Sequence, residues 1–221
     1  MPPPRRIAPS ILAADFARLG AQVREVVDAG ARTIHVDIMD GHFVPPFSMG
    51  PQVLSALTDL GFDGVEYDVH LMVERPERHI ADFVKAGAHN ITVHAEATPH
   101  LNYVVAQIRE LGCTAGVAVC PSTPLDVFRE LDVDLALCMT VNPGWGGQAF
   151  IPSSPDKIAR LRALIGDGPD LEVDGGIDVT TAGPAAEAGA TLFVAGSAVF
   201  GAADPAAAYH AIAAAAGCSQ P

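Results

Sequence analysis

The sequence predicts a single α/β domain, residues 1–221, with the closed (β/α)8 architecture of the TIM-barrel class. Three observations lead to this fold class. Eight short apolar segments have the character of strands, amphipathic segments with helical spacing lie between them, and no linker or low-complexity stretch divides the chain. Alternation of this kind predicts a parallel sheet, and eight units in 221 residues fit a closed barrel better than an open doubly wound sheet.

The predicted strands are short apolar runs, at residues 6–9, 33–39, 64–72, 90–94, 115–120, 135–141, 171–174 and 192–196. The second run shows the clearest alternation, because the aliphatic residues 34, 36 and 38 share one face. His35, Asp37 and Met39 therefore share the other face. A buried strand that gives one face to a histidine and an aspartate needs a chemical explanation, since buried ionisable groups require partners.

The predicted helices include residues 15–30, 76–87, 101–112, 154–166 and 204–216, each with apolar residues at helical spacing. Three helix-to-strand joints, DAGARTIHV, KAGAHNITV and EAGATLFVA, contain a glycine where a left-handed helix cap is favourable. The chain lacks a G-x-G-x-x-G motif, which makes a Rossmann fold the weaker alternative.

Charge and composition exclude several classes of partner. The formal net charge is −13, with 13 Lys and Arg against 26 Asp and Glu, so neither nucleic acid nor an anionic membrane surface is an expected partner. The uncharged run 135–155 contains prolines and glycines that oppose a membrane helix. The amino-terminal segment mimics a signal peptide, but Pro9 and Ser10 interrupt its apolar run and Asp15 ends it.

Cysteine usage points to a reducing compartment. No C-x-x-C pair is present, and the cysteines lie mostly in apolar, strand-like runs. We expect free thiols and a soluble cytoplasmic protein. The residues concerned are Cys113, Cys120, Cys138 and Cys218.

Candidate metal ligands lie near the ends of three predicted strands. In a (β/α)8 barrel the carboxyl ends of the strands carry the chemistry, so His35, Asp37, His70 and Asp174 should converge there. Two imidazoles and two carboxylates in one buried space need compensation, which a divalent cation provides. Nitrogen and oxygen donors without thiolate suit Zn²⁺, Fe²⁺, Mn²⁺ or Co²⁺, and the sequence does not choose among them. An ion-paired polar core is the alternative.

Glycine-rich loops follow the last three predicted strands. They are NPGWGGQ at 142–148, DGG at 174–176 and AGSAVFG at 195–201, of which the last also opens a short helix. Backbone N–H groups in such loops bind an anion without a basic side chain. None of these loops contains Lys or Arg, so the pattern predicts a phosphate site made of backbone.

Six segments resemble, in order and over nearly the entire chain, those of the ribulose-phosphate 3-epimerase family: IAPSILAADFARL, HVDIMDGHFVP, DVHLMV, VNPGWGGQ, VDGGI and AGSAVF. The resemblance implies a ribulose-phosphate-binding barrel of the pentose phosphate pathway. Such a barrel interconverts D-ribulose 5-phosphate and D-xylulose 5-phosphate, binds one divalent metal ion per subunit and forms a homo-oligomer.

The resemblance also implies roles for individual residues. His35, Asp37, His70 and Asp174 would be the metal ligands, and Asp37 and Asp174 would also be the catalytic acid/base pair. The expected substrate contacts are Ser10, His70, Asp174 and, at the phosphate end, Gly144, Trp145, Gly146, Gly147, Gly175, Gly176, Gly196 and Ser197. The methionines expected to surround the planar intermediate are Met39, Met72 and Met139, although core packing explains each of them nearly as well.

The chemistry agrees with this assignment. Inverting carbon 3 of a ketose requires removal of a proton on one face and return of a proton on the other, which one base cannot do. Carboxylates on the second and seventh strands can flank the sugar while a divalent cation stabilises the enediolate charge. The chain departs from the family pattern at Pro46, Trp145 and Ala149, where Asn, Phe and Lys are usual. These loop positions bear on closure over the substrate and on sugar preference.

Two alternatives stay open at this point. A sister enzyme that acts on allulose 6-phosphate shares much of the pattern. A catalytically silent barrel that binds a sugar phosphate or a metal for regulation has the same fold, because fold alone does not determine function.

Overall fold

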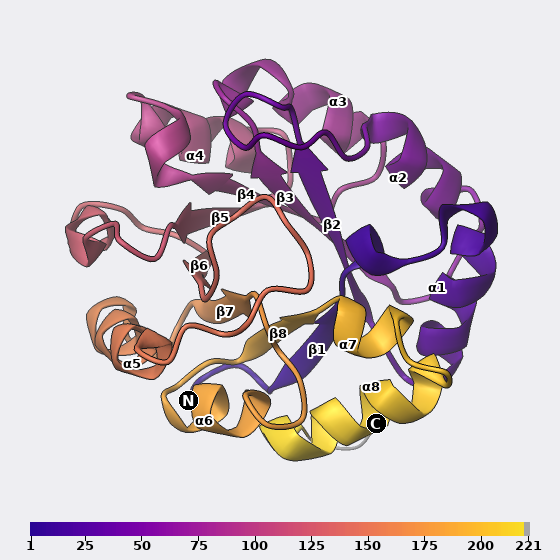
Figure 1. Ribbon diagram of the computed structural model, residues 1–221. Helices are drawn as coiled ribbons and strands as arrows, with labels where there is room; N and C mark the ends of the chain where they lie inside the picture. Colours follow the sequence, from indigo (N-terminus) through magenta and orange to yellow (C-terminus); the bar gives the residue numbers. More distant parts are fainter. Residues whose placement is uncertain (219–221) are drawn as a thin grey trace.

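The computed structural model describes residues 1–218, and within them eight parallel strands form a barrel surrounded by helices (Figure 1). The last three residues of the predicted domain lie outside the described range. The strands are β1 (Arg6–Pro9), β2 (Thr33–Met39), β3 (Glu66–Met72), β4 (Asn90–His94), β5 (Thr114–Val119), β6 (Leu135–Met139), β7 (Asp170–Asp174) and β8 (Leu192–Ala195).

Pairing in the sheet follows chain order. Each strand from β2 to β7 pairs in parallel with the next one along the chain, and β8 pairs with β1. One parallel bridge between Ser10 and His35 joins the end of β1 to β2 and completes the ring. The predicted (β/α)8 architecture is therefore confirmed.

The strand bounds differ from the predicted ones by one or two residues at several ends. Residues 64 and 65 precede β3, because Gly64 has φ +68 and turns the chain before it enters the sheet. Residues 140 and 141 follow β6, since the carbonyl of Thr140 accepts from Ile151 of its own loop rather than from a neighbouring strand.

Helices cover the outside of the barrel (Figure 1). They are α1 (Leu19–Asp28), α2 (Pro51–Thr58), α3 (Ile80–Lys85), α4 (Leu101–Glu110), α5 (Ser154–Ile165), α6 (Ala182–Glu187), α7 (Ser197–Phe200) and α8 (Pro205–Ala216). Local sequence sets their ends: Asp204 accepts from the N–H of Ala207 at the start of α8, and Gly217, at φ +69, ends it. The crossover after β5 has a 3-10 turn, Leu125–Arg129, in place of an α-helix.

Two apolar layers hold the barrel together. The larger one lies between strands and helices and includes Val36, Ile91 and Phe193. A smaller cluster, which includes Leu137 and Val194, packs within the barrel. Polar side chains replace apolar ones on the inner face of β2, β3 and β7, which places them beneath the loops that follow the strands.

Two further expectations concern membranes and thiols. Among residues 1–218, no helix has both the length and the apolar character that a membrane crossing requires. The four cysteines are free thiols.

Candidate active site and metal centre

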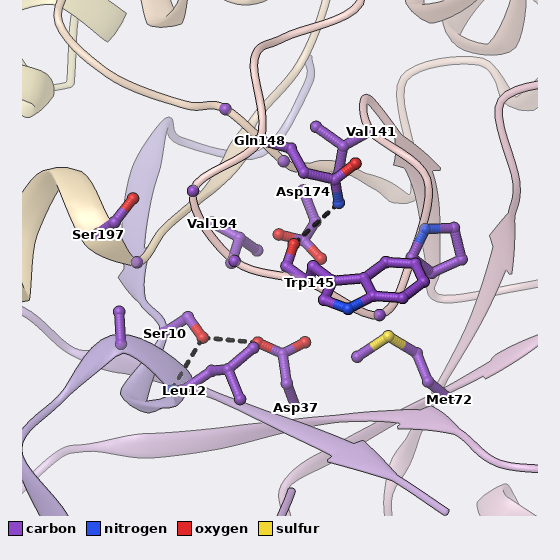
Figure 2. A pocket seen from close by; sticks show the side chains of 18 of the residues that line it. Ser10, Leu12, Asp37, Met72, Val141, Trp145, Gln148, Asp174, Val194 and Ser197 are labelled. Atoms are coloured by element: carbon purple, nitrogen blue, oxygen red, sulfur yellow. Dashed lines mark hydrogen bonds between the residues drawn. The ribbon is translucent and has the colours of Figure 1, made fainter. Parts of the chain in front are cut away.

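A cavity of about 330 Å³ opens at the carboxyl ends of the strands (Figure 2). Its lining contains both predicted acid/base residues, Asp37 and Asp174, together with Ser10. The loop between β6 and α5 lies across the barrel opening in Figure 1 and contributes Trp145 and Gln148 to the lining. The three predicted methionines and all eight predicted phosphate-end residues also line the cavity: Met39, Met72, Met139, Gly144, Trp145, Gly146, Gly147, Gly175, Gly176, Gly196 and Ser197.

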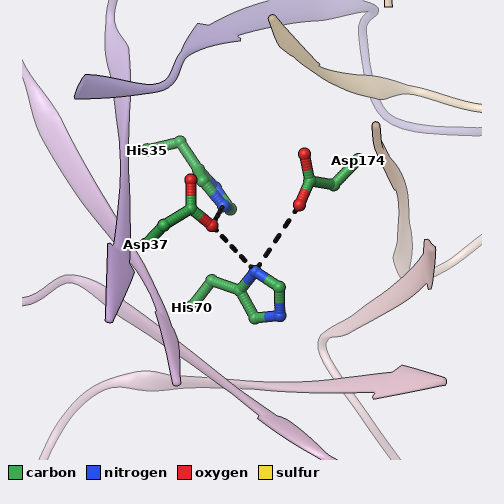
Figure 3. Close-up of side chains that lie close together, drawn as sticks. All are labelled: His35, Asp37, His70 and Asp174. Atoms are coloured by element: carbon green, nitrogen blue, oxygen red, sulfur yellow. Dashed lines mark hydrogen bonds and ion pairs between the residues drawn. The ribbon is translucent and has the colours of Figure 1, made fainter. Parts of the chain in front are cut away.

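The four predicted metal ligands converge beside this cavity (Figure 3). The register of β2 and β3 places Asp37 opposite His70, and their Oδ1 and Nδ1 atoms lie 3.1 Å apart. The same Nδ1 lies 3.7 Å from Oδ2 of Asp174, and Nε2 of His35 lies 3.2 Å from Oδ1 of Asp37. One ligand atom from each residue falls within 4.8 Å of all the others.

These residues fit a divalent cation. The donors are two nitrogens and two carboxylate oxygens, which suits a first-row divalent metal. Nδ1 of His35 lies 2.7 Å from Oδ2 of Asp68, so that a proton on Nδ1 leaves Nε2 to face the cluster. Ser10 donates to Oδ2 of Asp37 at 2.6 Å. His35 and His70 are fully buried and do not line the cavity, so His70 as a substrate contact stays a prediction.

The two carboxylates, Asp37 and Asp174, differ in pKa because their surroundings differ. Burial alone would raise the pKa of Asp37, but the charge of His35 and hydrogen bonds from His35 and His70 hold this pKa well below its ordinary value. Burial raises the pKa of Asp174 to about 7, and the charge of Asp37 acts in the same direction. At neutral pH one carboxylate is ionised and the other holds a proton for about half the time.

His35 is the cation that compensates Asp37. Burial would lower the pKa of His35, but Asp37 and Asp68 outweigh it and raise this pKa well above its ordinary value. For His70, burial is the largest effect, and the pKa is lowered.

Two acidic residues beneath the cluster, Asp68 and Glu172, are not among the predicted site residues. Asp68 has its pKa lowered to about 2, because His35 and Asn90 outweigh the effect of burial. Glu172 is fully buried, and neither of its oxygens has a hydrogen-bond partner among residues 1–218. Burial and the charge of Asp68 raise the pKa of Glu172 well above its ordinary value and so favour its neutral form, although Nδ1 of His35 lies 3.4 Å from Oε1 and acts in the opposite direction.

A pattern in the sequence would have located both residues. Asp68 lies two positions before His70 in β3, and Glu172 lies two positions before Asp174 in β7. Because the strand period is two residues, each acid must share the inner face of its strand with a predicted ligand, one layer deeper in the barrel.

The glycine loops are held in place by side chains. Thr140 donates through Oγ1 to the carbonyl of Gly175 at 2.6 Å, and Gln148 donates to the carbonyl of Trp145 at 2.8 Å. Gly176 has φ +66, and a Cβ there would lie 2.5 Å from the backbone nitrogen of Phe150. Gly176 is therefore required by the approach of two backbone segments.

The departures from the family pattern fall in two different places. Pro46 and Trp145 line the cavity, and Trp145 is 54% exposed at its mouth. Ala149 does not line it. Pro46 also lies near Gly144, so the loops after β2 and β6 meet at this point. Two of the three departures are thus positioned to affect what the cavity admits.

Fold and site together define a parallel (β/α)8 barrel in which a buried His/Asp cluster, a candidate metal site, adjoins a glycine-lined cavity. The chain belongs to the ribulose-phosphate 3-epimerase family, whose sequence model matches residues 6–200.

Individual relatives agree with this membership. The chain is 48% identical over 208 residues to ribulose-phosphate 3-epimerase of Bacillus subtilis (strain 168), covering 90% of this chain and 94% of the relative. It is 51% identical to the chloroplastic ribulose-5-phosphate-3-epimerase of Arabidopsis thaliana over 208 residues, which cover 90% of this chain and 72% of the relative.

A solved structure supports the fold alone. The structure of orotidine 5′-phosphate decarboxylase from Pyrococcus horikoshii OT3 superposes with a TM-score of 0.71 at 20% identity. The match covers 96% of this chain and 100% of that one.

Proposed function

We propose that the protein is a ribulose-phosphate 3-epimerase that interconverts D-ribulose 5-phosphate and D-xylulose 5-phosphate by inverting carbon 3. Family membership and the two named relatives support the reaction. The observation that carries the mechanism is the pair of carboxylates, Asp37 on β2 and Asp174 on β7, which line one cavity from two different strands.

The two carboxylates divide the proton transfers between them. In one direction ionised Asp37 removes the proton from one face of carbon 3, and protonated Asp174 returns a proton to the opposite face. The roles are exchanged in the reverse direction. Because the two carboxylates come from different strands, one can act as the base while the other acts as the acid. Ser10, which donates to Asp37, orients this carboxylate toward the substrate.

His35, Asp37, His70 and Asp174 would hold one divalent metal ion per subunit. The ion supplies Lewis-acid stabilisation of the negative charge that develops when the proton is removed. The methionines at the ends of β2, β3 and β6 form an apolar wall that excludes water from the reacting carbons. Zn²⁺, Fe²⁺, Mn²⁺ and Co²⁺ all suit the donor set.

The phosphate end of the substrate binds to backbone N–H groups of the glycine loops. No Lys or Arg is among the cavity-lining residues in the described chain, so no basic side chain competes for this role. Gly176 and Gly196 keep the backbone open to the ligand. By family resemblance we also propose a homo-oligomer in the cytoplasm.

Metal removal and replacement test the proposal. The protein is treated with a chelator, its metal content is verified, and conversion of D-ribulose 5-phosphate is followed after single metals are added back. We expect activity to be lost and then restored by at least one of the four metals. Full activity without metal would contradict the proposed site. Faster turnover of allulose 6-phosphate would replace the substrate by that of the sister enzyme.

A further inference from the structure

A chain of three side chains leads from the candidate metal site to the ends of β4 and β5. Nε2 of His70 lies 2.9 Å from Nε2 of His94, and Nδ1 of His94 lies 3.2 Å from Oε2 of Glu96. His94 is fully buried, its ring meets that of His70 edge to edge with centroids 5.0 Å apart, and the centroid of the Phe43 ring lies 4.7 Å away. His94 is thus held in one orientation from both sides.

Glu96 is itself fixed by the loop after β5. Its Oε1 accepts from the backbone N–H of Cys120 at 2.8 Å and from the hydroxyl of Thr123. Burial would raise the pKa of Glu96, but its hydrogen bonds lower this pKa to about 2. An ionised carboxylate can only accept, so Nδ1 of His94 must carry the proton that it shares with Oε2.

The direction of the hydrogen bonds from His70 through His94 to Glu96 decides which nitrogen of His70 can bind metal. Nδ1 of His70 faces Asp37 and Asp174, and it needs a free electron pair to be a ligand. The proton of His70 must then be on Nε2 and must be donated to His94. That donation is possible only when Nε2 of His94 accepts, which is the state that Glu96 selects.

We propose that Glu96 and His94 form a positioning relay that fixes the tautomer of His70 and thereby sets metal affinity at the site. This inference rests on the proposed metal-dependent function. Asp68 orients His35 directly, whereas Nε2 of His70 meets a second imidazole, that of His94. Partners of this kind typically change metal affinity by about 10- to 100-fold when they are altered.

Glu96, His94 and Cys120 also place ligand atoms within 4.8 Å of one another. A separate metal site there would need the thiolate of Cys120, but burial raises the pKa of this thiol to about 12, and Oε1 of Glu96 is occupied by two donors. The contacts therefore favour the relay.

The sharpest test is Glu96→Gln, which keeps the shape of the side chain but reverses the direction of its hydrogen bond with His94. The amide oxygen can still accept from Cys120 and Thr123, while its NH2 group donates to Nδ1 of His94. His94 then carries its proton on Nε2, facing the Nε2 proton of His70. We expect zinc affinity, measured by chelator competition, to fall about 10- to 100-fold.

Two control variants distinguish the effect of the reversed hydrogen bond from that of a general structural disturbance or the loss of a negative charge. Thr123→Val removes one bond to Glu96 without changing what Glu96 accepts from His94, and Glu66→Gln makes the same chemical change at an exposed position at the start of β3. We expect both controls to bind zinc within about threefold of the wild type. Long-range proton–nitrogen NMR of the zinc-loaded wild type should place the proton of His70 on Nε2.

The outcomes are distinct. If Glu96→Gln binds zinc as the wild type does, or if Thr123→Val loses as much affinity, the relay is wrong while the proposed metal site stands. If the wild type binds neither zinc nor any of the other three metals, the proposed metal site and the relay are both wrong. Melting of the metal-free proteins verifies that the variants fold.

A second pair of variants keeps the proposal testable if Glu96→Gln does not fold. His94→Gln retains an acceptor for His70 and a donor for Glu96, whereas His94→Leu retains neither. We expect the Gln variant to bind zinc at least tenfold more tightly than the Leu variant. Equal affinities of the two variants would overturn the relay.

Discussion

Protons and metal compete for the same atoms at the candidate metal site, so pH should control metal affinity. The perturbation is a change from pH 6 to pH 8 during metal titration of the metal-free protein. With the pKa of Asp174 at about 7, its carboxyl is ionised in about one molecule in eleven at pH 6 and about ten in eleven at pH 8. This group alone should raise metal affinity about tenfold over that range.

His35 adds to this effect. Its raised pKa means that Nε2 also loses a proton when a metal binds. Each additional proton released increases metal affinity by up to about tenfold per pH unit. The total rise in metal affinity between pH 6 and pH 8 should therefore lie between about tenfold and about a thousandfold. At pH 7 binding should release about half a proton from Asp174, and His35, whose pKa is raised, should release further protons.

Calorimetric titration in two buffers of different ionisation heat measures this proton release. Asp174→Asn is the matched variant, and its proton release at pH 7 should be smaller by about half a proton. Affinity that does not change between pH 6 and pH 8, or release that is the same in the variant, would refute the reasoning.

Two further predictions concern the buried acid and the phosphate end. Glu172 holds a proton that the unfolded chain releases above its ordinary pKa, so wild-type stability should fall relative to Glu172→Gln as pH rises from 5, by up to about 1.4 kcal/mol per pH unit until the folded pKa is reached. Melting temperatures of the metal-free proteins that change in parallel between pH 5 and pH 8 would contradict this. Ribulose without its phosphate should show kcat/KM lower by at least about a hundredfold, the value of two charge-assisted hydrogen bonds. Gly196→Ala should raise KM for the phosphorylated sugar. Its melting temperature should change little, because the new Cβ would meet Ala13 at an ordinary 3.5 Å. Gly168→Ala, whose Cβ would have no atom within 4 Å, should change neither KM nor melting temperature. Equal kcat/KM for the two sugars, or unchanged KM in Gly196→Ala, would remove the phosphate site.

Strand periodicity carried most of the fold prediction. Each predicted strand overlaps an observed one, because an apolar run bounded by turn residues has few other ways to be buried. The strand ends were less predictable, since they depend on turns such as that at Gly64. The crossover after β5 also departs from helix, where Pro121 and Pro124 restrict the backbone.

The candidate site was predictable where it follows from the ends of strands. His35 and Asp37 share a face within one strand, and the closed barrel brings His70 and Asp174 to the same place. Contacts between different units, such as His94 with His70, depend on the relative rotation of whole strands. Hydrophobic patterning does not encode that rotation, so the relay was visible only in three dimensions.

The central claim is that Asp37 and Asp174 exchange protons with opposite faces of carbon 3. The most direct measurement uses metal-loaded Asp37→Asn and Asp174→Asn, each with verified metal content, incubated with D-ribulose 5-phosphate in D2O. We predict that epimerisation falls at least about a hundredfold in both variants and in both directions, while exchange of deuterium at carbon 3 continues from the side of the intact carboxylate. Substantial formation of D-xylulose 5-phosphate by either metal-loaded variant would contradict the two-carboxylate mechanism.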